Sequence, residues 1–222
     1  MKHAVIVAHP DVRSFTISVA QAYCEAARAL GQEVLLRDLY RMNFAPCLTS
    51  EEIPKPLGFT PGEDVLDERR RLADVDVFAF VYPFWMNAQP AMLKGYIDRV
   101  FGMGFGYGAT KSGNVPLLRS RKMISFTSSG APMDWVKKSG SWDAARKLFD
   151  EHFAEVCGME VVEHIHFGAI HAGIRDDAVA AMLDRVHSVV GASFGDQISS
   201  PAAVNVLATP RQSRLEQSSK PA

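Results

Sequence analysis

Short apolar runs recur along the first 167 residues and alternate with longer stretches of helical periodicity. Runs of this kind, bounded by turn residues, are typical of strands that are buried on both faces of a parallel sheet. The runs occupy residues 4–8, 33–37, 75–81, 122–127 and 161–167. The sequence therefore predicts five buried strands.

The stretches between these runs have apolar residues three and four positions apart, which is the spacing of an amphipathic helix. Ser14 stands where the first helix needs an N-cap, and Gly31 stands where that helix should end. Further helices are expected at residues 63–73, 90–101, 141–156 and 176–190. This alternation predicts an α/β fold: a doubly wound five-stranded parallel sheet, order 2-1-3-4-5, with helices on both faces.

The loop after the third strand is unusually apolar. Phe84, Trp85 and Met86 follow that strand directly, and Pro90 stands in the first turn of the next helix. Open α/β sheets bind ligands outside the carboxyl ends of their strands. We interpret the loop as a wall for a flat aromatic ligand, although aromatic residues in most proteins simply fill the core.

Two other loops should meet this wall at the same edge of the sheet. Residues 9–14 lead into a helix N-terminus, where free N–H groups attract an anion. Ser14 and Thr16 can add hydroxyl groups there, while His9 and Arg13 can add positive charge. A phosphate site is one interpretation, and a Ser14 that only caps its helix is the other.

The loop after the fourth strand is made of small residues, Thr127, Ser128, Ser129 and Gly130. Small residues let the backbone approach a ligand closely. A phosphate site, an aromatic wall and a polar backbone edge together describe a flavin nucleotide lying across the point where the strand order reverses.

Composition limits the alternatives. The chain has 222 residues, a net charge of −1 and 47% hydrophobic residues, so we expect one flavin-binding domain at 1–190 and no nucleic-acid partner. Residues 191–222 are rich in Ser, Ala, Pro and Gln and are expected to be a partly disordered C-terminal extension. No apolar run is long enough for a transmembrane segment, and three scattered cysteines suit a cytoplasmic protein.

Three other features of the sequence have simpler explanations than a functional site. The glycine-rich stretch 102–108 follows a helix instead of a strand, so it is interpreted as a flexible loop and not as a dinucleotide fingerprint. His164, His166 and His171 could suggest a metal site, and the first two share one strand face. No Cys or carboxylate stands nearby at ligand spacing, so they are interpreted as core or edge histidines, with no metal site. The charged residues Glu51, Glu52, Asp64 and 68–71 are expected to be solvated.

Three stretches resemble the flavodoxin-like NAD(P)H:quinone oxidoreductases, the DT-diaphorase-like enzymes and their bacterial relatives. They are AHPDVRSF at 8–15, DLYRMNFAP at 38–46 and PFWMNAQPAMLKGYIDRVFGMGFGY at 83–107. The resemblance implies an NAD(P)H dehydrogenase (quinone): a homodimer that holds FAD or FMN and passes a hydride from NAD(P)H, through the flavin, to a quinone-like acceptor in a ping-pong cycle.

The resemblance also implies site residues, while the flavin itself supplies the catalytic chemistry, so no catalytic side chain is expected. The residues expected to bind the cofactor are His9, Ser14, Phe15, Thr16, Pro83, Phe84, Trp85, Met86, Thr127, Ser128 and Gly130. Asn87 and Tyr107 are expected to line the substrate pocket, Tyr107 from the partner subunit. FAD is favoured over FMN, because the segment 38–64 could cover an adenosine.

The sequence departs from the family in three places. Thr16 stands where many relatives have Asn, and Asn87 stands where they often have an aromatic residue. The Tyr and His that are proposed to relay charge in the animal enzymes are not evident, and Trp135 and 140–141 occupy that part of the chain. Protons needed there would have to come from backbone groups or water.

Other functions stay open on the same sequence. The first alternative is reduction of azo, nitro or chromate compounds at the same site. The second is a regulatory subunit of a glutathione-gated potassium efflux transporter, a role that some relatives have. The third is a nucleotide-binding protein without redox activity.

Overall fold

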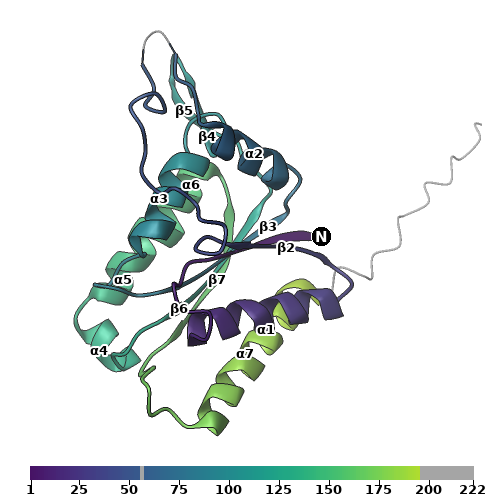
Figure 1. The fold of residues 1–222 in the computed structure, drawn as a ribbon, viewed down its shortest axis with the longest axis vertical. Helices are drawn as coiled ribbons and strands as arrows, with labels where there is room; N and C mark the ends of the chain where they lie inside the picture. The colour runs from purple at the N-terminus through teal and green to yellow at the C-terminus, as the bar shows by residue number, and fades with distance from the viewer. Residues whose placement is uncertain (56–57, 196–222) are drawn as a thin grey trace, which may run out of the picture.

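The computed structural model describes residues 1–55 and 58–195, in which a parallel sheet lies between two layers of helices (Figure 1). The sheet has the order β2-β1-β3-β6-β7, which is 2-1-3-4-5 when its five strands are counted alone. Its strands are β1 (Lys2–Val7), β2 (Glu33–Asp38), β3 (Val77–Pro83), β6 (Lys122–Ser128) and β7 (Glu160–Phe167). The predicted fold class and strand order are confirmed.

The apolar run of β3 suits its place at the centre of the sheet. All of its residues are buried, because helices cover both faces of the sheet and an apolar run can satisfy both. The edge strand β2 has only exposed and partly exposed residues. The run that predicted β3 began at residue 75, but the strand starts two residues later.

Two helices cover one face of the sheet, as Figure 1 shows: α1 (Phe15–Ala29) and α7 (Asp176–Phe194). The side chain of Ser14 accepts a hydrogen bond from the N–H of Ile17 (3.3 Å), which confirms the predicted N-cap. Gly31 has a φ of +72° and ends α1. The core on this face includes Tyr23 and Phe126, whose rings meet edge to face at 5.7 Å.

The other face packs against α2 (Glu63–Leu72), α3 (Ala91–Val100) and a helical stretch from residue 141 to residue 157. That stretch consists of α5 (Ser141–Ala145), the π-helical segment η1 (Arg146–Phe153) and α6 (Ala154–Cys157). The sequence predicted it as one ordinary helix. It did not predict the short helix α4 (Met133–Lys138), which is too short to show a period.

The glycine-rich stretch leads into a small hairpin instead of a flexible loop. Strands β4 (Tyr107–Thr110) and β5 (Gly113–Pro116) pair in antiparallel fashion. A Cβ at Gly106 would lie 2.1 Å from the carbonyl oxygen of Phe101, and Gly113 has a φ of +122°. These two glycines therefore serve close packing and a tight turn.

The last helix extends beyond the boundary that composition predicted at residue 190. It continues to Phe194, which is fully buried and meets the ring of His3 edge to face at 4.9 Å. The rest of the expected extension, residues 196–222, lies outside the described residues. None of the helices in the described part of the chain is long and apolar enough to cross a bilayer.

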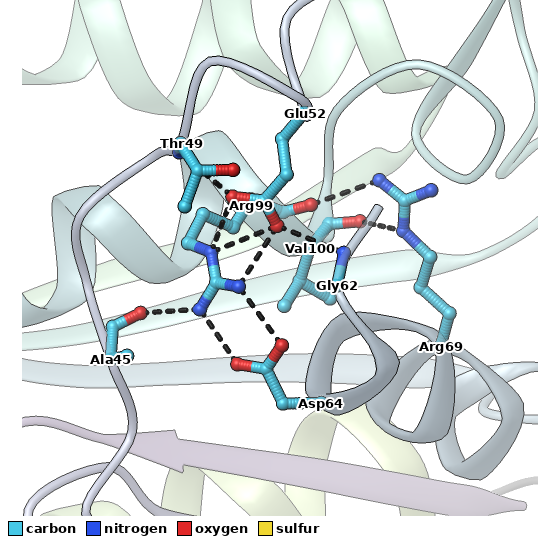
Figure 2. Close-up of polar contacts among 8 residues, drawn as sticks. All are labelled: Ala45, Thr49, Glu52, Gly62, Asp64, Arg69, Arg99 and Val100. Atoms are coloured by element: carbon cyan, nitrogen blue, oxygen red, sulfur yellow. Dashed lines mark hydrogen bonds and ion pairs between the residues drawn. The ribbon is translucent and has the colours of Figure 1, made fainter. Parts of the chain in front are cut away.

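Two of the charged residues that were expected to be solvated, Glu52 and Glu68, are buried instead, whereas Glu51, Asp64, Arg70 and Arg71 are exposed as expected. Figure 2 shows Arg99 at the end of α3 with its guanidinium between the carboxylates of Glu52 (2.9 Å) and Asp64 (2.7 Å). Glu68 is 3% exposed and accepts hydrogen bonds from Arg37 (2.7 Å) and the hydroxyl of Tyr96 (2.7 Å). The composition of a charged run does not reveal that its partners come from distant elements.

Candidate active site

A cavity of about 580 Å³ lies at the carboxyl edge of the sheet. At this point β1 leads into α1 on one face of the sheet, and the neighbouring strand β3 leads into α3 on the other face. Cavities of this size hold small molecules and cofactors. Most of the predicted cofactor-binding residues line it: His9, Ser14, Phe15, Thr16, Pro83, Phe84, Trp85, Ser128 and Gly130. The three loops therefore converge as the strand order requires.

One end of the cavity is suited to an anion. The N-terminus of α1 points there, and its first turn leaves the N–H groups of Phe15 and Thr16 without intrahelical acceptors. The cavity is also lined by Ser14, Ser18 and the highly exposed guanidinium-bearing side chain of Arg13. Together, these donors and this charge can hold a phosphate group.

The loop that leads into α1 is held in shape by its neighbours. The ring of His9 accepts a hydrogen bond from the N–H of Asp11 (3.1 Å), and the carboxylate of Asp11 accepts one from the N–H of Arg13 (2.9 Å). Arg41, which follows β2, donates to the carbonyl oxygens of His9 (2.7 Å) and Pro10 (2.6 Å). The anion end is thus built before any ligand arrives.

Aromatic side chains form the opposite wall. Phe84 is buried and its ring lies 4.9 Å from that of His166, whereas Trp85 is 44% exposed and lies 5.5 Å from the ring of His9. The exposed face of an indole is suited to stacking on a planar heteroaromatic ring.

The remaining edge is made of backbone groups. The carbonyl oxygen of Ser128 accepts a hydrogen bond from the N–H of Phe84 (2.7 Å), which joins the loops after β3 and β6. The N–H of Ser129 donates to the carbonyl oxygen of Phe167 (3.0 Å). The carbonyl oxygen of Ser129 accepts a hydrogen bond from the N–H of Ile170 (2.9 Å), so the loop after β7 is joined as well.

This fourth loop was missed from the sequence. It contributes Ile170, His171, Ala172 and Ile174, followed by Asp176 and Val179 of α7. The strand order could have indicated it, because β7 also ends at this edge of the sheet. Its sequence shows neither an aromatic run nor a run of small residues.

Four predicted site residues do not line the cavity in this chain. Met86 and Asn87 form an exposed turn with φ values of +52° and +60°. Thr127 is buried, and its hydroxyl lies 2.9 Å from ring nitrogens of both His164 and His166. Tyr107 lines another cavity beside Arg99, and its strand β4 lies at the opposite end of the molecule from α4 in Figure 1.

The two histidines of β7 are hydrogen-bonded, as the interpretation of core histidines requires. Burial, followed by the neighbouring His164, lowers the pKa of His166 to about 4, so that this ring is neutral near pH 7. Within residues 1–55 and 58–195, no group of three His, Cys, Asp or Glu side chains is placed to hold a metal ion.

Comparison with known proteins agrees with the fold. Residues 1–190 match a family described as having a flavodoxin-like fold. The chain is 36% identical over 185 residues to a protein of Haemophilus influenzae named as an uncharacterized NAD(P)H oxidoreductase, and the match covers 83% of this chain and 91% of the relative.

Two solved structures extend the comparison. The NAD(P)H:quinone oxidoreductase from Methanothermobacter marburgensis has a TM-score of 0.74 and 29% identity, covering 86% of this chain and 94% of that one. An FMN-dependent NADH-azoreductase from Bacillus anthracis, solved in complex with FMN, has a TM-score of 0.66 and 19% identity, covering 86% and 98%. At that identity, the second likeness shows the fold alone.

Proposed function

The chain belongs to the flavodoxin-like fold family, and on that premise we propose that it is an NAD(P)H-dependent flavin oxidoreductase that reduces quinones by two electrons. The observation that supports this most directly is the cavity at the β1/β3 switch point, which has an anion-binding end and an aromatic wall. Its relatives from Haemophilus influenzae and Methanothermobacter marburgensis are named as NAD(P)H oxidoreductases.

In this proposal the two ends of the cavity bind different parts of the flavin. The N–H groups of Phe15 and Thr16, with Arg13 beside them, bind the phosphate of the flavin. Phe84 and Trp85 cover its ring system, and backbone groups of Ser128 to Gly130 border the polar edge of that ring. The flavin, when bound, supplies the hydride chemistry. The protein binds and orients the reactants and excludes water from the ring.

We propose FMN as the flavin. The expectation of FAD depended on the segment 38–64 covering an adenosine, yet none of the described residues of that segment lines the cavity. The N-terminus of α1 lies beside a cluster of hydroxyl groups and suits one phosphate, whereas α7, whose N-terminus also lines the cavity, begins with the acidic residues Asp176 and Asp177. The FMN complex of the Bacillus anthracis azoreductase has the same fold.

We also propose that the active form is a homodimer. Asn87 is exposed in the loop after β3, while Tyr107 lines a different cavity of the same chain. Tyr107 can therefore reach a substrate only from a second copy. A cytoplasmic location is proposed as well, since Cys24, Cys47 and Cys157 are all free thiols.

A visible spectrum of the purified protein under anaerobic conditions tests the proposed function first. We expect flavin bands at roughly 375 and 450 nm that bleach when NADPH or NADH is added. Adding a benzoquinone should restore them, and an azo dye in a parallel sample measures the alternative acceptor. If neither FMN nor FAD binds, the protein is not a flavoenzyme and the proposal is wrong.

A further inference from the structure

A chain of hydrogen-bonded side chains runs from the helical stretch 141–157 through the sheet. The carboxylate of Asp150, in η1, lies 2.8 Å from Nδ1 of His164. Nε2 of the same ring lies 2.9 Å from the hydroxyl of Thr127. Asp150 and Thr127 are each 2% exposed, so other protein groups provide their hydrogen-bond partners.

The chain continues to the rim of the cofactor cavity. The hydroxyl of Thr127 also lies 2.9 Å from Nδ1 of His166, and Nε2 of His166 lies 2.8 Å from the hydroxyl of Ser129. Ser129 lines the cavity and donates its hydroxyl proton to the carbonyl oxygen of Ala131 (2.8 Å). Five hydrogen bonds thus join a buried carboxylate to the cofactor site.

Counting protons shows that this row of hydrogen bonds holds one more proton than an ionised Asp150 and the four neutral side chains supply. Each of the five hydrogen bonds needs one proton. Two neutral imidazoles and two hydroxyl groups supply four, and an ionised Asp150 supplies none. A fifth proton is therefore required for these five bonds to form at once, with the longer contact from the Thr127 hydroxyl to the carbonyl oxygen of Ile165 (3.4 Å) left unmade.

The fifth proton belongs to the pair of His164 and Asp150. An imidazolium is stabilised by a carboxylate 2.8 Å away, while burial keeps the ring of His166 neutral. With His164 protonated on both nitrogens, each remaining bond has a single direction. His164 donates to Thr127, Thr127 donates to His166, and Nε2–H of His166 donates to Ser129.

We propose that Asp150, His164, Thr127, His166 and Ser129 form a proton relay that stores one proton and delivers it to an anionic acceptor in the cofactor cavity. The identity of that acceptor, a reduced flavin, rests on the proposed function. Ser129 is the residue that touches the ligand, and the other four are positioning residues that act through it.

Delivery moves one proton across each of the three bonds between His164 and Ser129, and one proton from Ser129 to the acceptor. Ser129 gives its hydroxyl proton to the acceptor and takes the Nε2 proton of His166. His166 takes the proton of Thr127 on Nδ1, and Thr127 takes the Nε2 proton of His164. Four protons stay in the chain, His164 becomes neutral, and the tautomer of His166 changes from Nε2–H to Nδ1–H.

A second cavity, of about 380 Å³, lies at the far end of the relay and allows it to be recharged by solvent. Asp150 and His164 line it together with Trp142, Arg146 and Glu163. Arg146 lies 3.6 Å from the carboxylate of Asp150, and Glu163 is exposed. From the sheet side, burial and then the charge of Asp150 raise the pKa of the Tyr82 phenol. Among the described residues, the second carboxylate oxygen of Asp150 has no hydrogen-bond partner, so it is free to accept a proton donor from this cavity.

Long-range ¹H–¹⁵N NMR spectra of the histidine rings test the relay in the flavin-free protein. Near pH 7 we expect His164 to be protonated on both nitrogens and His166 on Nε2 alone. In Asp150→Asn, His164 should become neutral and His166 should switch to the Nδ1–H tautomer. A matched change in the same helical stretch, Asp143→Asn at an exposed site, should leave both rings unchanged.

A second substitution separates a relay from a local effect. Thr127→Val removes the link between the two rings, so adding Asp150→Asn in that background should no longer change the tautomer of His166. A neutral His164 in the wild-type protein near pH 7 would overturn the proposal. So would an Asp150→Asn protein in which His166 keeps its tautomer. If Asp150→Asn does not fold, raising the pH of the wild-type protein until His164 loses its proton must switch His166 in the same step.

The cofactor step is tested separately. With FMN bound, reduction by dithionite should switch His166 to Nδ1–H in the wild-type protein but not in Thr127→Val. If FMN does not bind, the proposed function is wrong while the relay in the free protein stands. If FMN binds and is reduced without a change at His166, the proton delivery is wrong and the oxidoreductase proposal is unaffected.

Discussion

Arg99 is a residue of the sequence stretch that most resembles the quinone oxidoreductases, yet it lies away from the cofactor cavity. Its side chain is 5% exposed and pairs with Glu52 and Asp64. Its guanidinium also donates to the carbonyl oxygen of Ala45 (2.6 Å). The residue thus ties α3 to the long segment after β2 (Figure 2).

Removing Arg99 should destabilise the protein strongly. Arg99→Ala leaves Glu52 buried without its partner, and we expect a loss of about 3–5 kcal/mol in the free energy of unfolding by urea. Arg99→Lys should lose less, because lysine keeps the charge but not the forked geometry. Lys94→Ala breaks an exposed pair with Asp98 on the same helix and should cost less than about 0.5 kcal/mol. Equal losses for Arg99→Ala and Lys94→Ala would contradict the role of burial.

At the scale of elements, α3 depends on a close approach to the segment after β2. Gly95 faces Pro46, and a Cβ at Gly95 would lie 2.1 Å from the carbonyl oxygen of Pro46. The glycine therefore sets how closely the helix and the segment pack, although glycine is a poor residue for a helix interior.

Gly95→Ala should destabilise the protein for this reason. Alanine favours a helix by up to about 1 kcal/mol over glycine, but overpacking against Pro46 should cost more, giving a net loss of about 1–3 kcal/mol. Gly191→Ala in α7 is the matched control, because its Cβ meets nothing within 4 Å. That variant should gain up to about 1 kcal/mol in urea unfolding. A gain at both positions would show that α3 has room to move.

At the scale of the whole molecule, buried neutral histidines make stability depend on pH. Burial lowers the pKa of His3 to about 4, and burial together with His164 does the same for His166. Both rings have a lower pKa in the folded state than the usual 6.5. Their contribution is therefore present above pH 6.5 and is lost as the pH falls towards 4.

We expect the free energy of unfolding to fall over that window by an amount on the order of 3 kcal/mol for each ring. Urea unfolding at a series of pH values measures this. His3→Phe should flatten the curve between pH 6.5 and 4, whereas His187→Gln, at an exposed position, should not.

A second fall in the free energy of unfolding, below pH 4.5, belongs to Glu52. Burial would raise the pKa of Glu52, but its bonds to Arg99 and to the N–H groups of Thr49 and Gly62 lower it to about 2.

The proposed dimer is also a property of the whole molecule. Light scattering of the eluted protein should give twice the chain mass of 24.4 kDa. Tyr107→Ala should slow quinone reduction without weakening flavin binding, because Tyr107 lies far from the cavity of its own chain. A fully active species at 24.4 kDa would contradict a contribution from the partner subunit.

The sequence by itself determined the sheet, the cap of α1 and the loops that form the cavity. These features depend on local chemistry. Buried parallel strands need apolar runs, Ser14 bonds within its own turn, and the carboxyl ends of parallel strands meet at one edge. His9, Phe84 and Ser128 could be placed together for this reason alone.

Only the tertiary structure decided the contacts that join distant segments. Glu52 looked like a surface residue because its partner Arg99 stands 47 positions away. The relay from Asp150 to Ser129 depends on β6 lying beside β7, with Thr127 opposite His166. The loop at 170–174 and the position of Tyr107 were decided in the same way, because a hydrogen bond or a cavity depends on distances in space that no local pattern records.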